Sequence, residues 1–356
     1  MSVPLPPKWV RRIVVIPVVW FIAVWLLVAA IPGIVAIVAI VSFALPGRLR
    51  ALRLFGFFLV GMVVEVIGLA IAFITWVLSG FGLAMQRPTF VGINYSVVRG
   101  GLDVLFWFGC RYFELKVDGE GPYLPGDDGD PTTREYPLLV MSRHAGPGDS
   151  FLLVHELLSW AGRRPRIVLK DTLQLDPFID VYLNRLPMRF VDPTSSTQGE
   201  TLAQIARLAS TMAPQDALVI FPEGGNVTPA RRERAIEKLR SSGRHEAAER
   251  AERIRHLMPP RPGGVRAALE ANADLHVVVV AHTGLDHLNT LADIWQEIPL
   301  RKTLHMRWHA VPSVEVPHDS AGLSDWLFTE WEQMDLWVAE HHEANGDSTA
   351  RRDPAP

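Results

Sequence analysis

The sequence contains almost no cysteine and no large excess of charge of either sign. Its single cysteine, Cys110, stands among 356 residues, so an internal disulfide is excluded, as is a zinc site built from several thiolates. A catalytic thiol needs an activating base, whereas Cys110 ends an apolar run that begins at Leu105, which favours an inert packing role. The formal net charge of −3 gives no reason to expect a nucleic acid as partner.

Charged residues are also scarce in the first 85 positions. Uncharged runs cover residues 13–31 and 34–45, and a third run, 54–85, contains only Glu65. A membrane span needs about 20 apolar residues, so the first and third runs are long enough. Pro32 and Gly33 separate the first two runs and predict a bend or a tight helical hairpin. We therefore expect membrane-embedded helices in residues 1–86, with membrane lipid as a partner.

Basic residues flank these runs and indicate which side of the membrane each end faces. They are Lys8, Arg11 and Arg12 before the first run, and Arg48, Arg50 and Arg53 before the third. Basic flanks face the cytoplasm, so a hairpin fits residues 13–45. The third run then either crosses once or folds back, with Gly61, Gly68 or Gly80 at a bend, and Glu65 faces protein or the interface. A cleaved secretory signal is the alternative, although the apolar sequence continues too far for one.

Short apolar segments alternate with helix-like segments after residue 135. The strand-like segments, rich in Val, Ile and Leu, are 138–142, 166–169, 188–191, 217–221 and 276–281. The helix-like segments between them are 150–161, 178–185 and 200–212, whereas the mixed apolar segment 91–110, before this region, is expected to form an interfacial or docking helix. Continuous apolar strands between helices predict an α/β fold with a largely parallel, buried sheet flanked by helices. We place this domain at residues 87–342.

Three further segments complete the organisation. Residues 231–256 carry nine Lys or Arg and five Asp or Glu, which predicts either a solvated, salt-bridged helical insertion or a surface for anionic lipid or an acidic acyl carrier. A stripe of apolar residues from Leu323 to Val338 keeps helical spacing, with Ser324 as the expected N-cap, and indicates core packing. The polar tail, 343–356, is expected to be disordered.

The residues suited to catalysis begin where the segment 138–142 ends. His144 follows this strand, a Gly-Pro-Gly turn comes next, and Asp149 opens a helix. The turn can bring the Asp149 carboxylate to the His144 imidazole. A hydroxyl group needs a base to attack a thioester, and a histidine held by a carboxylate is suited to that. The alternative is that Asp149 only caps the helix and His144 only ends the strand.

A second motif follows the apolar strand 217–221. It reads Phe221-Pro222-Glu223-Gly224-Gly225-Asn226. Ligands bind at the carboxyl ends of strands in α/β folds, and glycines let a substrate approach the backbone closely. We therefore expect Glu223, Gly224, Gly225 and Asn226 to contact substrate. A turn with a solvent-facing glutamate is the alternative.

Together these motifs resemble the glycerophospholipid acyltransferase family, whose best-known members are the 1-acyl-sn-glycerol-3-phosphate acyltransferases. His144 and Asp149 match its H-x4-D block and Phe221–Gly224 its F-P-E-G block, while Lys170–Asp192 and the strand 277–281 fit two further blocks in order. The resemblance covers about residues 110–285.

This resemblance implies a reaction and its partners. A fatty acyl group would pass from acyl-CoA or acyl carrier protein to the free hydroxyl of a lysophospholipid, foremost 1-acyl-sn-glycerol 3-phosphate, giving phosphatidic acid. His144 and Asp149 would be catalytic, with no cofactor and no metal. Another lyso-lipid or a glycolipid acceptor is the alternative. Because the donor thioesters are cytoplasmic, we expect the catalytic domain on the cytoplasmic side of the cell membrane.

The sequence departs from the family at two arginines thought to hold the acceptor phosphate. Asn226 stands at one of these positions and Pro193 near the other. A neutral asparagine cannot make a bidentate charged contact. Candidate substitutes for the missing charges are Arg143, Arg185 and Arg189, and Lys170 is a further candidate for substrate binding.

Two readings of other classes compete with an acyltransferase. One is a metal hydrolase, with either His305 and His309 or a group formed by His282, Asp286 and His287 as ligands. The other is a membrane scaffold that binds lipid without turnover, through the charged segment 231–256.

Overall fold

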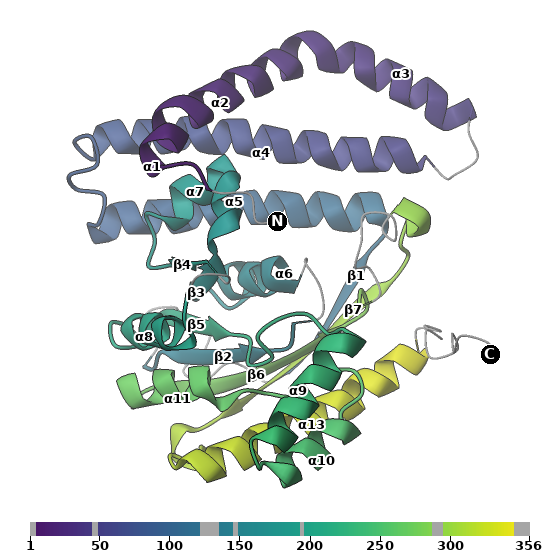
Figure 1. Ribbon diagram of the computed structural model, residues 1–356. Coiled ribbons are helices and arrows are strands. Elements are labelled where there is room, and N and C mark those ends of the chain that lie inside the picture. Colours follow the sequence, from purple (N-terminus) through teal and green to yellow (C-terminus); the bar gives the residue numbers. More distant parts are fainter. Residues whose placement is uncertain are drawn as a thin grey trace. The chain divides into compact units, whose positions relative to one another are not determined.

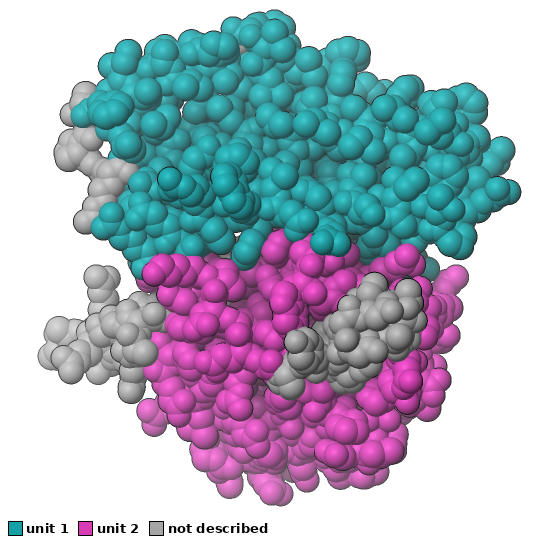
Figure 2. Space-filling view, turned by 180° about the vertical axis from the view of Figure 1, so that it is seen from behind, with its two compact units in different colours: residues 1–115, 168–197, 295–301 teal, residues 116–167, 198–294, 302–356 magenta. Residues whose placement is uncertain are grey.

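The computed structural model describes residues 5–44, 49–121, 135–144, 149–192, 196–286 and 295–344. The chain divides into two compact units, coloured separately in Figure 2. Unit 1 comprises residues 1–115, 168–197 and 295–301, and unit 2 comprises residues 116–167, 198–294 and 302–356. The units therefore interleave along the chain.

Unit 1 begins with one helical stretch from Lys8 to Ala44. Its successive parts are α1 (Lys8–Val10), η1 (Arg11–Val15), α2 (Ile16–Trp25), η2 (Leu26–Ala30) and α3 (Ile31–Ala44). Figure 1 shows the stretch changing direction between α2 and α3, beside Pro32. A proline removes one helical hydrogen bond, which allows such a bend. The predicted bend is therefore present, and the alternative hairpin is wrong because the stretch does not turn back on itself.

The third apolar run folds back as one half of a helical hairpin. Helix α4 (Arg50–Leu78) packs against α5 (Pro88–Phe113), which runs in the opposite direction (Figure 1). Gly80 lies in the turn between them with a φ of +70°, whereas Gly61 and Gly68 lie inside α4. The bend is thus at Gly80, one of the three predicted positions.

Helix α7 (Pro177–Leu183), which follows the short 3-10 helix η4 (Asp171–Leu175), packs directly on the α4 backbone. A Cβ added at Gly68 would overlap the Phe178 ring, so only glycine fits there. Glu65 accepts a hydrogen bond of 3.0 Å from the Phe178 amide. The single charge in the third run therefore faces protein, as predicted.

Two helices within the described residues, Lys8–Ala29 and Arg50–Leu78, are long and apolar enough to cross a membrane. Large apolar side chains along both are exposed, including Phe21 at 65% and Phe73 at 63%. Contiguous apolar surface on this scale is unfavourable in water. These helices are consistent with membrane association of the N-terminal segment.

A buried carboxylate ties the first helical stretch to α7. Asp180 is 1% exposed and pairs with Arg11 at 3.0 Å and Arg12 at 3.2 Å. The Asn184 amide donates to the same carboxylate at 3.0 Å, and Arg11 also donates to Gln174 at 3.0 Å. Two of the basic residues that precede the first apolar run, Arg11 and Arg12, are therefore paired within unit 1.

The seven strands form one sheet in the order β1-β7-β6-β2-β5-β3-β4. All neighbouring strands are parallel except β6 and β7. The strands are β1 (Lys116–Glu120), β2 (Leu138–Ser142), β3 (Arg164–Lys170), β4 (Arg189–Val191), β5 (Asp216–Ile220), β6 (His276–Thr283) and β7 (Thr303–Val311). The predicted α/β fold with a largely parallel sheet is confirmed, and all five strand-like segments are strands.

The helices of unit 2 lie on both faces of the sheet. They are α6 (Asp149–His155), η3 (Glu156–Trp160), α8 (Gln198–Ala209), α9 (Pro229–Ser241), α10 (His245–Arg253), α11 (Pro262–Ala271), η5 (Ser313–Glu315) and α13 (Ser320–Ala344). Figure 1 shows α6 on one side of β2 and β6, and α11 and α13 on the other. Every residue of β2 and β5 is buried, as expected for strands covered on both faces.

Helix α13 begins before its expected cap. The carboxylate of Asp319 accepts hydrogen bonds from the amides of Ala321 and Gly322, so the helix starts at Ser320. Ser324 lies inside the helix, where its hydroxyl accepts a hydrogen bond from Arg244, and the N-cap predicted there is wrong. The apolar stripe from Leu323 to Val338 is buried, which confirms its predicted role in the core. The expected disordered tail, from residue 345 on, lies outside the described residues.

We predict that Asp180→Ala lowers the free energy of unfolding by about 3–5 kcal/mol, because it leaves buried arginines without a counter-charge. Denaturation of the detergent-solubilised protein, followed by tryptophan fluorescence, measures this. Glu237→Ala is the matched control, since the Glu237 side chain is 71% exposed and its ion pair with Arg240 is long, at 4.0 Å. The control should change stability by less than about 0.5 kcal/mol, and equal effects of the two variants would contradict the prediction.

Candidate functional site

The register of two central strands brings both sequence motifs to one edge of the sheet. Strands β2 and β5 are parallel neighbours, with Met141 opposite Ile220. His144 follows the first strand and Phe221 follows the second, so both leave the sheet at the carboxyl ends of the strands. The rings of His144 and Phe221 lie 5.0 Å apart between centroids. This is the edge where α/β folds bind ligands.

Glu223 connects the two motifs directly. Its carboxylate is 1% exposed, and one oxygen accepts a hydrogen bond of 3.2 Å from the His144 backbone amide. The other oxygen accepts a hydrogen bond of 3.3 Å from the indole N–H of Trp331 on α13. The alternative of a solvent-facing glutamate is therefore wrong, and the geometry gives Glu223 a positioning role behind His144. Direct contact between Glu223 and substrate stays a prediction.

Gly224 and Gly225, which follow Glu223, form a turn that requires glycine. Gly224 and Gly225 have φ values of +69° and +146°, which residues with a Cβ rarely adopt. The Gly224 amide donates to the Phe221 carbonyl at 3.0 Å, and the Asn226 carbonyl accepts from Arg231 at 3.2 Å. Gly224 is exposed, so its backbone is accessible beside His144.

The Arg143 side chain makes its contacts in the interior of unit 2. Its guanidinium is 2% exposed and donates to the carbonyls of His282 at 2.9 Å and His256 at 3.2 Å. It also pairs with Asp286 at 2.5 Å. These contacts hold the ends of β2 and β6 together, and a role for Arg143 in substrate binding stays a prediction.

The other basic candidates belong to unit 1. Lys170 is exposed at the end of β3, and Arg189, at the start of β4, donates to the Met188 carbonyl at 3.0 Å. Arg185 donates to the Ala72 carbonyl at 2.9 Å and to the Thr75 hydroxyl at 3.1 Å, and burial lowers its pKa to about 10. Arg185 thereby holds α4 to the end of α7. Substrate contacts of Lys170 and Arg189 stay predictions.

Two sequence positions fall outside what the structure describes. Asp149 begins helix α6, but its side chain and the turn at residues 145–148 are not among the described atoms, and neither is Pro193. The pairing of Asp149 with His144 therefore stays a prediction.

The residues considered as metal ligands have other partners. His282 contacts the Arg143 carbonyl at 3.2 Å, and Asp286 pairs with Arg143. His305 lies 3.5 Å from Asp118 and His309 2.9 Å from Glu330, so the two histidines of β7 face different carboxylates. Within the described ranges, which leave out His287, no group of three or more His, Cys, Asp or Glu could hold a metal ion.

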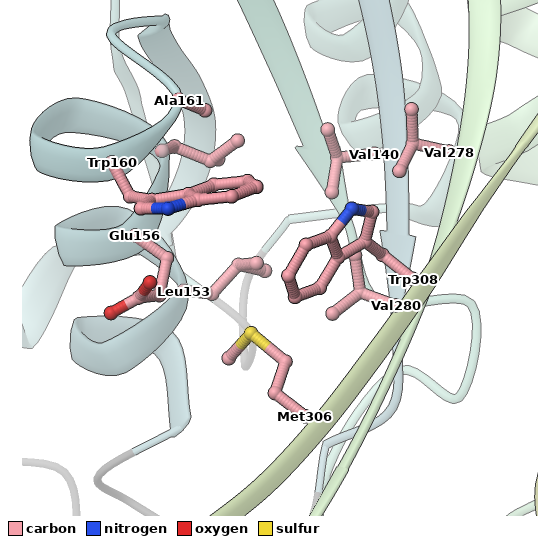
Figure 3. Close-up of a pocket in the computed structure, with 10 residues that line it drawn as sticks. Val140, Leu153, Glu156, Trp160, Ala161, Val278, Val280, Met306 and Trp308 are labelled. Carbon is pink, nitrogen blue, oxygen red and sulfur yellow. The ribbon is translucent and has the colours of Figure 1, made fainter. Parts of the chain in front are cut away.

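An apolar hollow lies between the helix that follows Asp149 and the strands. Figure 3 shows Trp160 reaching into it from the helix and Trp308 from the strands, while the Glu156 carboxylate turns away. The two indole rings meet edge to face at 4.8 Å between centroids. Its other lining residues are Val140, Leu153, Leu157, Ala161, Val278, Val280 and Met306. This composition suits an apolar chain.

We predict that Glu223→Gln reduces the activity of the protein by about 10²-fold, because an amide cannot accept both hydrogen bonds and the His144 backbone shifts. The rate at saturating substrate should fall, since His144 is the base that the sequence predicts and its displacement would affect the chemical step. Glu332→Gln is the control for the same chemical change, because Glu332 pairs with Arg250 on the surface of α13. Unchanged activity in Glu223→Gln would remove the positioning role.

Comparison with known proteins gives a match to one family. No curated protein and no solved structure matches the chain. The family model described as Acyltransferase matches residues 127–283, a range that contains both His144 and Glu223. This match supports the assignment of residues 127–283 to the acyltransferase family.

Proposed function

We propose that the protein transfers a fatty acyl group from acyl-CoA or acyl carrier protein to the free hydroxyl of a lysophospholipid, with 1-acyl-sn-glycerol 3-phosphate as the preferred acceptor. The observation that carries this proposal is the hydrogen bond between the His144 amide and Glu223. It joins the two motifs at the carboxyl edge of the sheet, inside the range matched by the Acyltransferase model.

The proposed reaction needs one base and two bound substrates. The His144 imidazole accepts the hydroxyl proton while the acceptor oxygen attacks the thioester carbonyl carbon. The carbon–sulfur bond then breaks, and the imidazolium returns the proton to the departing thiolate. Asp149 is assigned the role of stabilising the imidazolium. The products are an ester and a free thiol, so the sequence of steps needs no cofactor, metal or acyl-enzyme.

The apolar hollow supports the lipid nature of the substrate. Its walls come from β2, which leads to His144, and from α6 and η3, which follow Asp149. A fatty acyl chain bound between these elements would have its thioester end close to the proposed catalytic pair, His144 and Asp149. We assign the hollow to the acyl chain that is transferred.

Membrane attachment fits substrates of this kind. The acceptor resides in lipid, while the donor thioesters are cytoplasmic. The two apolar helices of unit 1 would hold the enzyme at the membrane, and we propose that the catalytic unit acts on the cytoplasmic side.

We predict that His144→Ala lowers acyl transfer by about 10² to 10⁴-fold, the usual cost of losing a general base. Labelled acyl-CoA with membranes or purified protein gives the rate. His309→Ala is the control, because His309 is also in unit 2, belongs to neither motif and pairs with Glu330. If the protein is a non-catalytic scaffold, the wild-type protein should show no acyl transfer. Near wild-type transfer by His144→Ala would contradict the role of His144 as general base.

We predict that Trp160→Ala shifts donor preference toward longer chains, because it opens one wall of the hollow. The ratio of kcat/KM for octadecanoyl-CoA to that for tetradecanoyl-CoA should rise at least about tenfold, since even one additional methylene held in an apolar pocket is worth about 1–3 kcal/mol. Trp160 is 55% exposed, so the change should leave folding intact. Trp295→Ala, another partly exposed tryptophan, should leave the ratio unchanged, and an unchanged ratio in Trp160→Ala would contradict the assignment.

A further inference from the structure

Two arginines that no motif identifies lie against the glycine turn beside His144. A Cβ added at Gly224 would be 3.0 Å from a terminal nitrogen of Arg261, and one added at Gly225 would overlap the Arg231 guanidinium. Arg231 also donates to the carbonyls of Asn226 at 3.2 Å and Gly224 at 3.4 Å. The missing side chains at both glycines thus leave room for two guanidinium groups at the turn.

The positive charges of these arginines are not neutralised by a carboxylate within the described residues. Neither Arg231 nor Arg261 belongs to any ion pair there. Glu223, which directly precedes the Gly224–Gly225 turn, is buried and directs both carboxylate oxygens to N–H donors. Arg261 is exposed at the start of α11, so a ligand can reach the N–H donors of its guanidinium group.

Backbone contacts fix Arg261 close to the proposed base. Its own amide donates to the Pro222 carbonyl at 3.0 Å, and the next residue, Glu223, accepts from the His144 amide. The start of α11 is therefore held against the same turn that holds His144. Arg143, another basic group considered for this purpose, is engaged elsewhere, since it donates to carbonyls in the interior of unit 2.

The geometry points to a phosphate site formed by Arg231 and Arg261 over the Gly224–Gly225 turn, which binds the phosphate headgroup of the acceptor. Guanidinium groups bind phosphate through paired, charge-assisted hydrogen bonds. In a 1-acylglycerol 3-phosphate the free hydroxyl and the phosphate are on adjacent carbons, so a phosphate near this turn places the hydroxyl near His144. In acyl-CoA the pantetheine arm separates the phosphates from the thioester. The acceptor is therefore favoured as the substrate whose phosphate binds at this turn. This inference rests on the proposed function.

Steady-state kinetics with two acceptors that differ only in the phosphate test the site. Arg261→Ala should raise KM for 1-oleoyl-glycerol 3-phosphate by about 10- to 100-fold, because charged hydrogen bonds are worth about 1.5–3 kcal/mol. It should leave transfer to 1-oleoyl-glycerol and KM for oleoyl-CoA unchanged. Arg261→Lys should restore part of the affinity, since it keeps the charge and loses the bidentate contact.

Arg266→Ala is the matched control, because Arg266 lies on the same helix and pairs with Glu270 at 3.6 Å on the surface. It should leave the KM for 1-oleoyl-glycerol 3-phosphate, the transfer to 1-oleoyl-glycerol and the KM for oleoyl-CoA unchanged. Equal loss with both acceptors in Arg261→Ala, or no loss with either, would overturn the phosphate site. A rise in KM for oleoyl-CoA alone would assign the phosphate to the donor and overturn the acceptor assignment. Wild-type protein that transfers to neither acceptor would instead defeat the proposed function itself.

Discussion

The burial of one carboxylate, that of Glu223, is the constraint on which the site depends. A buried carboxylate is stable only when donors satisfy its oxygens. Here the donors are the backbone of His144, at the end of β2, and the indole of Trp331, on α13. Three elements far apart in sequence must therefore meet at one point. The strand register that brings β2 beside β5 is what makes this arrangement reachable.

Unit 1 also contains carboxylates, those of Asp180 and Glu65, that are held by specific partners. Asp180 is buried with two arginines from the first helical stretch, and Glu65 caps the amide of Phe178. The charges interrupting apolar segments are thus paired with α7 and its neighbours rather than left facing lipid. These pairs hold the apolar helices to residues 168–197, which explains why the units interleave in the sequence.

Much of the fold could be predicted because the central strands are buried on both faces. Their continuous apolar residues make them distinct from loops. Strand β1 could not be predicted, because it is polar and every residue is exposed at the sheet edge. The position of His144 and Glu223 at strand ends also followed from sequence. The inward direction of Glu223 did not, because its partner lies 79 residues away and the contact depends on strand register. Arg261 carried no signal, since nothing local relates it to Gly224.

The contact between Trp331 and Glu223 also bears on the order in which the protein is made. The range matched by the family model ends at residue 283, yet the second donor to Glu223 comes from the last helix. A ribosome must therefore synthesise the chain beyond Trp331 before the turn beside His144 receives both of these hydrogen bonds. The apolar helices of unit 1, in contrast, leave the ribosome first. If these helices bind lipid, as proposed above, their attachment would precede completion of the site, and the nascent chain would already be at the membrane when α13 folds into place.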